Sequence, residues 1–166
     1  YNADNGFAIS SNVVSQGANT GGVLNNESKT SWATQVGYTQ PNYSVSAILN
    51  MKYNSWTDEY FQTTAGFARG GDGNSTNVGL RAWWRPTNAD TAVPSISLGY
   101  DTSETGASSN SNTTAYFVGL NWTDVLNPDD KIGLAFGQPQ KQEGETVDPF
   151  LYCLLYTSDA ADEWCG

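Results

Sequence analysis

Three residues in the middle of the chain, Arg81, Trp83 and Arg85, combine positive charge with an aromatic ring at a spacing of two. In a β-strand this spacing puts the three side chains on one face and the residues between them on the other. Lys52 lies on the polar face of the preceding alternating stretch. Guanidinium groups bind hydroxyls or anions, and an indole ring stacks on a sugar ring or on a neighbouring arginine. The spacing therefore predicts a polar binding surface.

Residues for enzymatic chemistry are scarce. The chain has no His, and both cysteines lie near its C-terminal end, so the common catalytic triads and most transition-metal sites cannot be built. The adjacent carboxylates Asp58–Glu59 and Asp129–Asp130 fall in turn-rich stretches, and we interpret them as solvated turn residues. A net charge of −10 disfavours nucleic acid as a partner. We expect no enzyme, no cofactor and no metal site.

The C-terminal segment 153–166 differs from the sequence before it. It contains Cys153 and Cys165 and shows neither turn residues nor the alternation of a strand. Cys153–Glu163 resembles the translation of a transposon-type sequencing adapter, so we expect residues 153–166 to be non-native and residues 1–152 to form the native domain. On this interpretation the chain is a fragment. The alternative is a short native helix with a disulfide.

Seven stretches have the alternation and the aromatic and β-branched content of β-strands. The expected strands are Ala3–Ser10, Ser31–Thr39, Tyr43–Tyr53, Asn77–Arg85, Val93–Asp101, Thr113–Trp122 and Lys131–Gln138, and an eighth begins at Pro149. Most of them are close to the roughly 9–11 residues that a tilted strand needs to cross a bilayer.

The two faces of these strands are unusual for a soluble sheet. Alternate residues of Tyr43–Tyr53 form an apolar line with an aromatic residue at each end. In the hairpin Thr113–Gln138, the face opposite the large apolar side chains is mostly small or polar, which would make a poor core. Phe117 is the exception, and it either packs against an inserted loop or indicates a different fold. A sheet of this kind can expose its apolar face to lipid, with aromatic residues at the two interfaces.

The connections between the strands alternate in expected length. Ser11–Thr30, Asn54–Thr76, Thr102–Asn112 and Pro139–Asp148 are longer, whereas Gln40–Asn42, Pro86–Ala92 and Thr123–Asp130 are shorter. Short periplasmic turns and long external loops are typical of outer-membrane barrels. The predicted fold class is therefore all-β, an antiparallel up-and-down transmembrane β-barrel, present here as a partial barrel of about seven to eight strands. The alternative is a β-sandwich of about seven strands.

Several segments resemble one family in the same order along the chain. AYFVGLNW, KIGLAFGQPQ and GLRAWWRP, together with NGFAIS and WATQVGYTQPNYSVSAIL, are similar to the OprB-type carbohydrate-selective porins and above all to their cyanobacterial branch, the iron uptake porins. The likeness covers most of Tyr1–Tyr152. It implies an outer-membrane barrel of about sixteen strands and an N-terminal S-layer-homology segment that tethers the protein to the cell wall. Neither that segment nor the later strands is part of this sequence.

Within such a barrel, polar side chains would line a water-filled pore. The pore-lining candidates are Lys52, Arg81, Trp83, Arg85 and Asn121. For Arg85 there is an equal alternative, because an arginine beside Pro86 at a strand end commonly extends to the membrane interface. The aromatic segment Asn54–Thr76 is expected to fold into the pore and narrow it, with Tyr60, Phe61 and Arg69 as constriction candidates.

The predicted function is that of an outer-membrane porin. It would let small hydrophilic solutes diffuse passively, and the resemblance implies carbohydrates or inorganic ions such as iron. The expected partners are these solutes, outer-membrane lipid, the cell wall and further copies in a homo-oligomer. The alternative function is a secreted carbohydrate-binding β-sandwich module, and a glycosidase built on paired carboxylates is a distant third.

Overall fold

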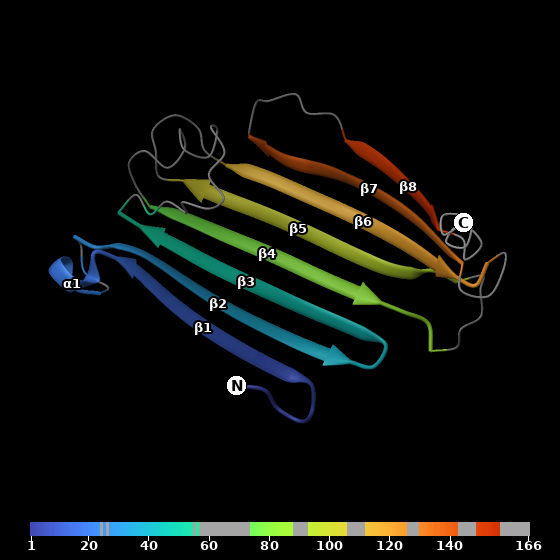
Figure 1. The fold of residues 1–166 in the computed structure, drawn as a ribbon, viewed down its shortest axis with the longest axis horizontal. Helices are drawn as coiled ribbons and strands as arrows, with labels where there is room; N and C mark the ends of the chain where they lie inside the picture. Colours follow the sequence, from blue (N-terminus) through green and yellow to red (C-terminus); the bar gives the residue numbers. More distant parts are fainter. Residues whose placement is uncertain are drawn as a thin grey trace, which may run out of the picture.

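The computed structural model describes residues 1–23, 25, 27–54, 56, 74–87, 93–105, 112–125, 130–142 and 149–156. They form β1 (Phe7–Gln16), α1 (Ala18–Gly21), β2 (Lys29–Gln40), β3 (Tyr43–Tyr53), β4 (Ser75–Trp84), β5 (Ser95–Thr105), β6 (Thr113–Thr123), β7 (Lys131–Gln142) and β8 (Phe150–Tyr156). All eight strands belong to one antiparallel sheet, in the order of the sequence (Figure 1). The all-β, up-and-down prediction is confirmed, and the sheet is open, because β1 and β8 do not pair with each other.

Strand bounds follow the alternation closely in the centre of the sheet and less closely at its ends. β3 has the predicted bounds, whereas β1 runs six residues beyond the predicted end at Ser10. Ser11–Gln16 has polar residues on both faces, which conceals a strand, yet it pairs with β2 as far as Gln16 opposite Lys29. β7 likewise continues past Pro139, which lies beside the irregularity between Thr114 and Tyr116, where a proline needs no ladder partner.

These longer strands change the expected rhythm of the connections. The first four connections, residues 17–28, 41–42, 54–74 and 85–94, still alternate between longer and shorter. The last three, residues 106–112, 124–130 and 143–149, have equal lengths. The prediction that connection lengths alternate is therefore wrong for the second half of the chain. The reason is that the polar ends of β5 and β7 belong to the strands and not to the connections.

The last strand crosses the expected boundary between native and non-native sequence. In β8, Cys153 pairs with Leu134 and Tyr156 pairs with Lys131. The expectation that the residues after Tyr152 lack a strand pattern is wrong for Cys153–Tyr156. A run of apolar and aromatic residues next to an open strand edge is enough to extend the sheet.

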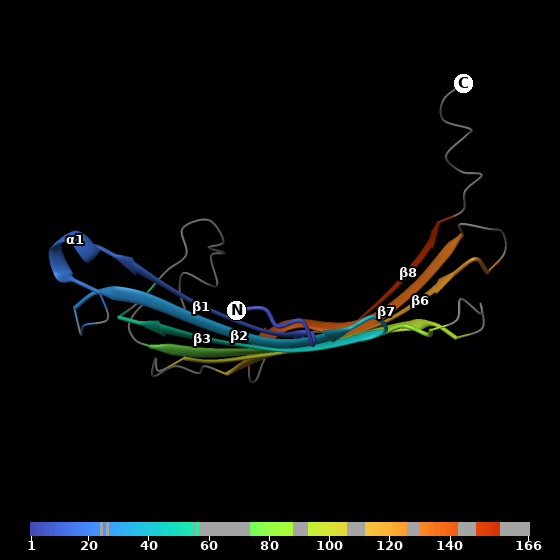
Figure 2. The ribbon, with the colours of Figure 1, turned by 90° about the horizontal axis from the view of Figure 1, so that it is seen from below.

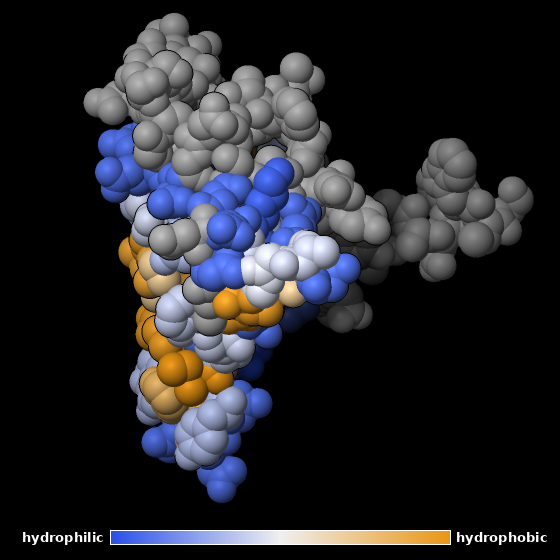
Figure 3. Space-filling model, turned by 90° about the vertical axis from the view of Figure 1, so that its left-hand side faces the viewer, coloured by the Kyte–Doolittle hydropathy of each residue, from blue (hydrophilic) through white to orange (hydrophobic). Residues whose placement is uncertain are grey.

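The sheet has a concave face and a convex face. Figure 2 shows it as a shallow trough whose two side edges rise on the same side. Directly paired residues of an antiparallel sheet project to the same face, and the pairings place the apolar lines of all strands together. Most of the exposed hydrophobic side chains of the strands lie on the convex side, away from the opening of the trough (Figure 3). They include Ile9, Trp32, Val45, Leu49, Leu80, Trp84, Leu98, Val118, Leu134 and Phe136, all well exposed.

No hydrophobic side chain in the described part of the chain is buried. A sandwich would bury the same apolar lines between two packed sheets, but the described strands form a single sheet. Of the described residues, none belongs to a helix long and apolar enough to cross a membrane.

Candidate functional site: the concave polar face

The concave face carries the polar members of each strand pair. It includes Asn12, Ser31, Ser46, Asn50, Lys52, Asn77, Arg81, Trp83, Ser97, Asp101, Phe117 and Asn121, as the cross-strand pairings assign them. Four of the five predicted pore-lining residues, Lys52, Arg81, Trp83 and Asn121, therefore do share one face. They come from β3, β4 and β6, with β5 supplying Asp101 between them.

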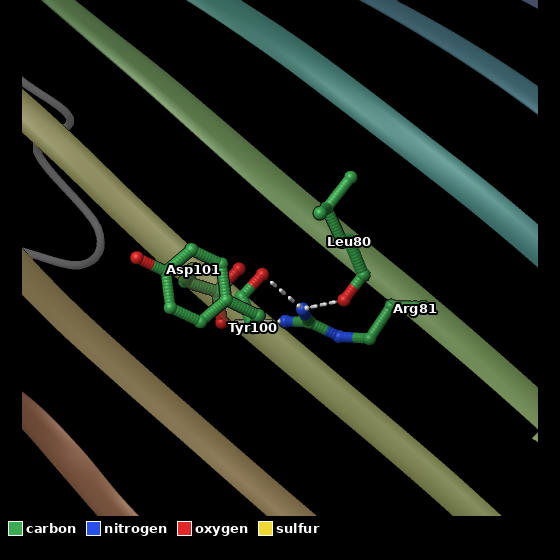
Figure 4. Close-up of polar contacts among 4 residues, drawn as sticks. All are labelled: Leu80, Arg81, Tyr100 and Asp101. Carbon is green, nitrogen blue, oxygen red and sulfur yellow. Dashed lines mark hydrogen bonds and ion pairs between the residues drawn. The ribbon is translucent and has the colours of Figure 1, made fainter.

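Arg81 is held against the wall of the sheet by three acceptors and one aromatic ring. Its Nη2 forms an ion pair with Asp101 Oδ2 at 2.8 Å, and its Nη1 donates to the carbonyl oxygens of Leu80, at 2.8 Å, and Tyr100, at 3.3 Å. Figure 4 shows the guanidinium reaching from β4 onto β5, where Asp101 and Tyr100 lie. The guanidinium carbon is also 5.8 Å from the centre of the Phe117 ring. The charge is thus largely neutralised in place.

Phe117 is a large aromatic residue on the otherwise mostly polar face. Its ring occupies space that the missing side chain of Gly99 leaves open. It pairs directly with Gly99 on β5 and with Gly137 on β7. A Cβ on Gly99 would overlap the ring of Phe117, and one on Gly137 would lie 3.0 Å from Phe117 Cβ. The row across the sheet therefore alternates in size, as Arg81, Gly99, Phe117, Gly137 and Phe150. Packing of an aromatic ring over a cross-strand glycine explains Phe117 without an inserted loop or a second sheet.

Arg85 lies one residue past the end of β4 and is held against the turn between β2 and β3. Its Nε and Nη2 both donate to the carbonyl oxygen of Pro41, at 2.9 and 2.7 Å, and its backbone N–H donates to Asn42. Its guanidinium carbon also lies 5.4 Å from the centre of the Trp83 ring. This contact confirms the predicted stacking of Trp83 on a neighbouring arginine. The two roles given for Arg85, at the pore wall and at the membrane interface, both stay predictions.

Lys52 lies near the end of β3, beside a ladder of amides and hydroxyls. Asn50 Nδ2 donates to Ser31 Oγ at 3.2 Å, and Asn77 Nδ2 donates to the Oδ1 of Asn50 at 3.3 Å. Together with Trp56 these residues line a hollow of about 400 Å³. The ammonium group of Lys52 has no partner among the described residues.

The other predicted sites are either remote or not described. Asn121 is exposed on β6, away from the Arg81 cluster, between its partners Ser95 and Gly133. The constriction candidates Tyr60, Phe61 and Arg69 lie outside the described residues, as do Asp58, Glu59 and Asp129. Asp130 is fully buried, so its interpretation as a solvated turn residue is wrong. In the described ranges no three acidic, His or Cys side chains form a metal-binding cluster.

The sequence predicted Arg81 as a site residue but did not predict its partners, Asp101 and Phe117. Asp101 was visible as a polar-face residue of its strand, but its diagonal position relative to Arg81 depends on how β4 and β5 pair. Gly99 carried a signal that could have been used, because a glycine within a strand often marks a close approach by another group. Trp56 follows a strand end and has no periodic pattern that would place it.

The arrangement provides hydrogen-bond donors, amides and aromatic faces on the concave surface, which suits the binding of polar molecules. Comparison of the chain with family models, curated proteins and solved structures finds no match.

Proposed function

We propose that this chain is part of the wall of an outer-membrane β-barrel, a porin of the OprB type through which small hydrophilic solutes diffuse. The observation that carries the proposal is the opposition of two faces in one sheet: exposed hydrophobic side chains on the convex side and polar side chains on the concave side. A barrel wall needs this arrangement, with lipid outside and water inside. The proposed localisation is the bacterial outer membrane.

The convex face has the features that contact with lipid requires. The first seven strands have 10 to 12 residues each, about the length that crosses a bilayer at a tilt. Three of its polar groups bond to one another: Trp32 Nε1 donates to Ser11 Oγ at 2.7 Å, and this oxygen lies 3.0 Å from Thr34 Oγ1. Polar groups in hydrocarbon need such internal partners, because no water is present to satisfy them.

The concave face would line the water-filled pore. Selectivity would come from the width of the pore and from fixed groups on its wall, such as Arg81 with its partner Asp101, and Lys52 with its amide neighbours. The solutes we propose are carbohydrates or inorganic ions such as iron. Tethering to the cell wall and assembly with further copies are further parts of the proposal.

Trp83 and Trp84 provide a direct test, since they are adjacent residues on opposite faces. Two single-Trp variants of the whole chain, one retaining Trp83 and the other Trp84, would be refolded into vesicles that contain lipids brominated along the acyl chain. We expect bromine to quench Trp84 strongly and Trp83 weakly, and aqueous iodide to give the opposite order. A soluble monomer whose Trp84 is insensitive to brominated lipid would contradict the proposal.

A further inference from the structure

The end of the sheet that carries α1 has a hollow whose chemistry differs from that of the Arg81 cluster. We infer that this hollow binds a small organic carboxylate with a flat apolar body, through the ammonium group of Lys52 and the ring of Trp56. The site would deepen the proposed function, on which its role in a channel rests, by giving the concave face a binding point for anionic solutes. Binding itself requires only the folded sheet.

The hollow is assembled from four neighbouring strands and one residue beyond them. Its volume is about 400 Å³, and its polar lining comes from Asn12, Ser31, Asn50, Lys52 and Asn77, together with Trp56. Pockets of roughly this size hold small organic molecules. Ala33 and Val14 add apolar surface to that of the indole ring, so the hollow can hold the body of a ligand as well as its charge.

The charge of the hollow is positive. Lys52 is the one ionisable residue among those that line it, and no described lining residue is acidic. In a chain with a net charge of −10, an unpaired lysine inside a hollow is distinctive, since Arg81 is paired with Asp101 at 2.8 Å. A half-buried lysine with no partner among the described residues favours an anion, and a carboxylate would give its ammonium group charge-assisted hydrogen bonds.

Two of the amide nitrogens that line the hollow, those of Asn50 and Asn77, are already engaged. Asn50 Nδ2 donates to Ser31 Oγ, and Asn77 Nδ2 donates to the carbonyl oxygen of Asn50 at 3.2 Å as well as to Oδ1 of the same residue. These bonds hold this part of the lining in one arrangement, so little conformational entropy would be lost when a ligand binds. They also leave the Lys52 ammonium as the charged donor of the hollow, with no partner among the described residues.

Trp56 is placed by a defined turn after β3. Asn54 adopts a left-handed backbone conformation with φ 55°, and its Nδ2 donates to the carbonyl oxygen of Ser28 at 2.8 Å. Its backbone N–H donates to Asn74 Oδ1 at 3.1 Å, and the N–H of Trp56 donates to the carbonyl oxygen of Tyr53 at 3.3 Å. The turn thereby places Trp56 in the lining of the same hollow as Lys52, and an aromatic side chain there could pack against a flat ligand.

Benzoate and benzamide are suitable probes, because they have nearly the same shape and only benzoate is charged. Binding to the refolded 166-residue chain would be measured by calorimetry and by the fluorescence of a variant that retains Trp56 as its single tryptophan. We expect saturable binding of benzoate that weakens with added salt and binding of benzamide that is weaker by about tenfold, the loss of one charge-assisted interaction.

Variants of the lining residues identify the site. Lys52→Gln should weaken benzoate binding by about tenfold and leave benzamide binding unchanged, whereas Lys131→Gln, a lysine at the opposite end of the sheet, should change neither. Trp56→Leu should weaken both probes. Equal affinity for the two probes, no saturable binding of benzoate, or an effect of Lys131→Gln as large as that of Lys52→Gln would each overturn the inference.

The inference and the proposed function can fail separately. Quenching of Trp84 by brominated lipid tests the membrane-facing wall without reference to any ligand, and benzoate binding tests the hollow in detergent without a membrane. Benzoate binding combined with a Trp84 that is insensitive to brominated lipid would support the binding site and contradict the proposed porin function. Quenching of Trp84 by brominated lipid without benzoate binding would support the porin wall and overturn the binding site.

Discussion

Asp101 holds Arg81 from a diagonal position across the sheet. Arg81 pairs directly with Gly99, and Asp101 pairs with Gly79, so the 2.8 Å ion pair runs obliquely between β4 and β5. Gly79 leaves room for it, because a Cβ there would come within 2.9 Å of Asp101 Oδ1. The carboxylate therefore determines where the positive charge of Arg81 lies on the concave face.

Asp101→Asn should free Arg81 chemically with little effect on stability. The two side chains are about half exposed, at 47% and 45%, and pairs of this kind contribute below about 1 kcal/mol to the free energy of unfolding. We expect phenylglyoxal to modify Arg81 severalfold faster in the variant, as measured by peptide mass spectrometry relative to Arg85. Glu104→Gln, which removes a carboxylate of the same strand on the convex face, should leave the rate unchanged.

Gly99→Ala should destabilise the sheet, because the new methyl group would overlap the ring of Phe117. Overpacking of this kind costs about 1–3 kcal/mol in the free energy of unfolding, and the displaced ring would lose its contact with Arg81. Urea unfolding in detergent, followed by circular dichroism, would measure the loss. Gly119→Ala is the matched control, since a Cβ there meets Ser97 Cβ at an ordinary 3.6 Å. Equal losses for the two variants would contradict the packing described here.

Ser11→Ala should be costly in a bilayer even though it replaces a hydroxyl by an apolar group. The indole N–H of Trp32 and the hydroxyl of Thr34 would lose their shared partner on the convex face. We expect a loss of about 0.6–2 kcal/mol in unfolding from vesicles. Ser10→Ala alters the neighbouring residue on the concave face, where water replaces the lost bonds, and should be nearly neutral. A larger effect of Ser10→Ala would indicate that the faces are assigned the wrong way round.

Arg85→Lys should loosen the turn between β2 and β3 despite conserving the charge. A lysine carries its donors on one nitrogen. It therefore cannot reproduce the two bonds that Nε and Nη2 of Arg85 donate to the carbonyl oxygen of Pro41. The expected cost is about 0.5–1.5 kcal/mol, local to the hairpin. Hydrogen exchange should show faster deuterium uptake in the peptide that contains Asn42, with unchanged uptake in β5.

The sequence predicts the strands best where one face is continuously apolar. β3 was predicted residue for residue because Tyr43–Tyr53 alternates throughout. β1 was cut short because the hydroxyl and amide side chains of Ser11–Gln16 give no contrast between faces, and backbone pairing with β2 decides that segment instead. Pro139 suggested a strand end, whereas the irregularity opposite Ala115 admits a proline. The hydrophobic alternation of a strand shows which of its faces is apolar. How far the strand extends depends on its backbone pairing with the neighbouring strand.

The candidate site was predictable to the same degree. A spacing of two put Arg81 and Trp83 on one face without knowledge of any neighbour. The partners of Arg81 come from β5 and β6, and which residues of those strands lie beside it depends on the alignment of three strands. For the same reason Phe117 looked out of place: the glycine that accommodates it is on another strand.

The alternation in size along the row from Arg81 to Phe150 also limits how neighbouring strands can slide. A slip of one residue would exchange the faces, and the hydrophobic pattern opposes it. A slip of two keeps every side chain on its own face, so that pattern does not oppose it. Such a slip would bring Phe117 opposite Ser97 or Asp101 instead of Gly99, and both have a Cβ where the ring must lie. The glycines thus favour the native pairing of these strands over pairings shifted by two residues.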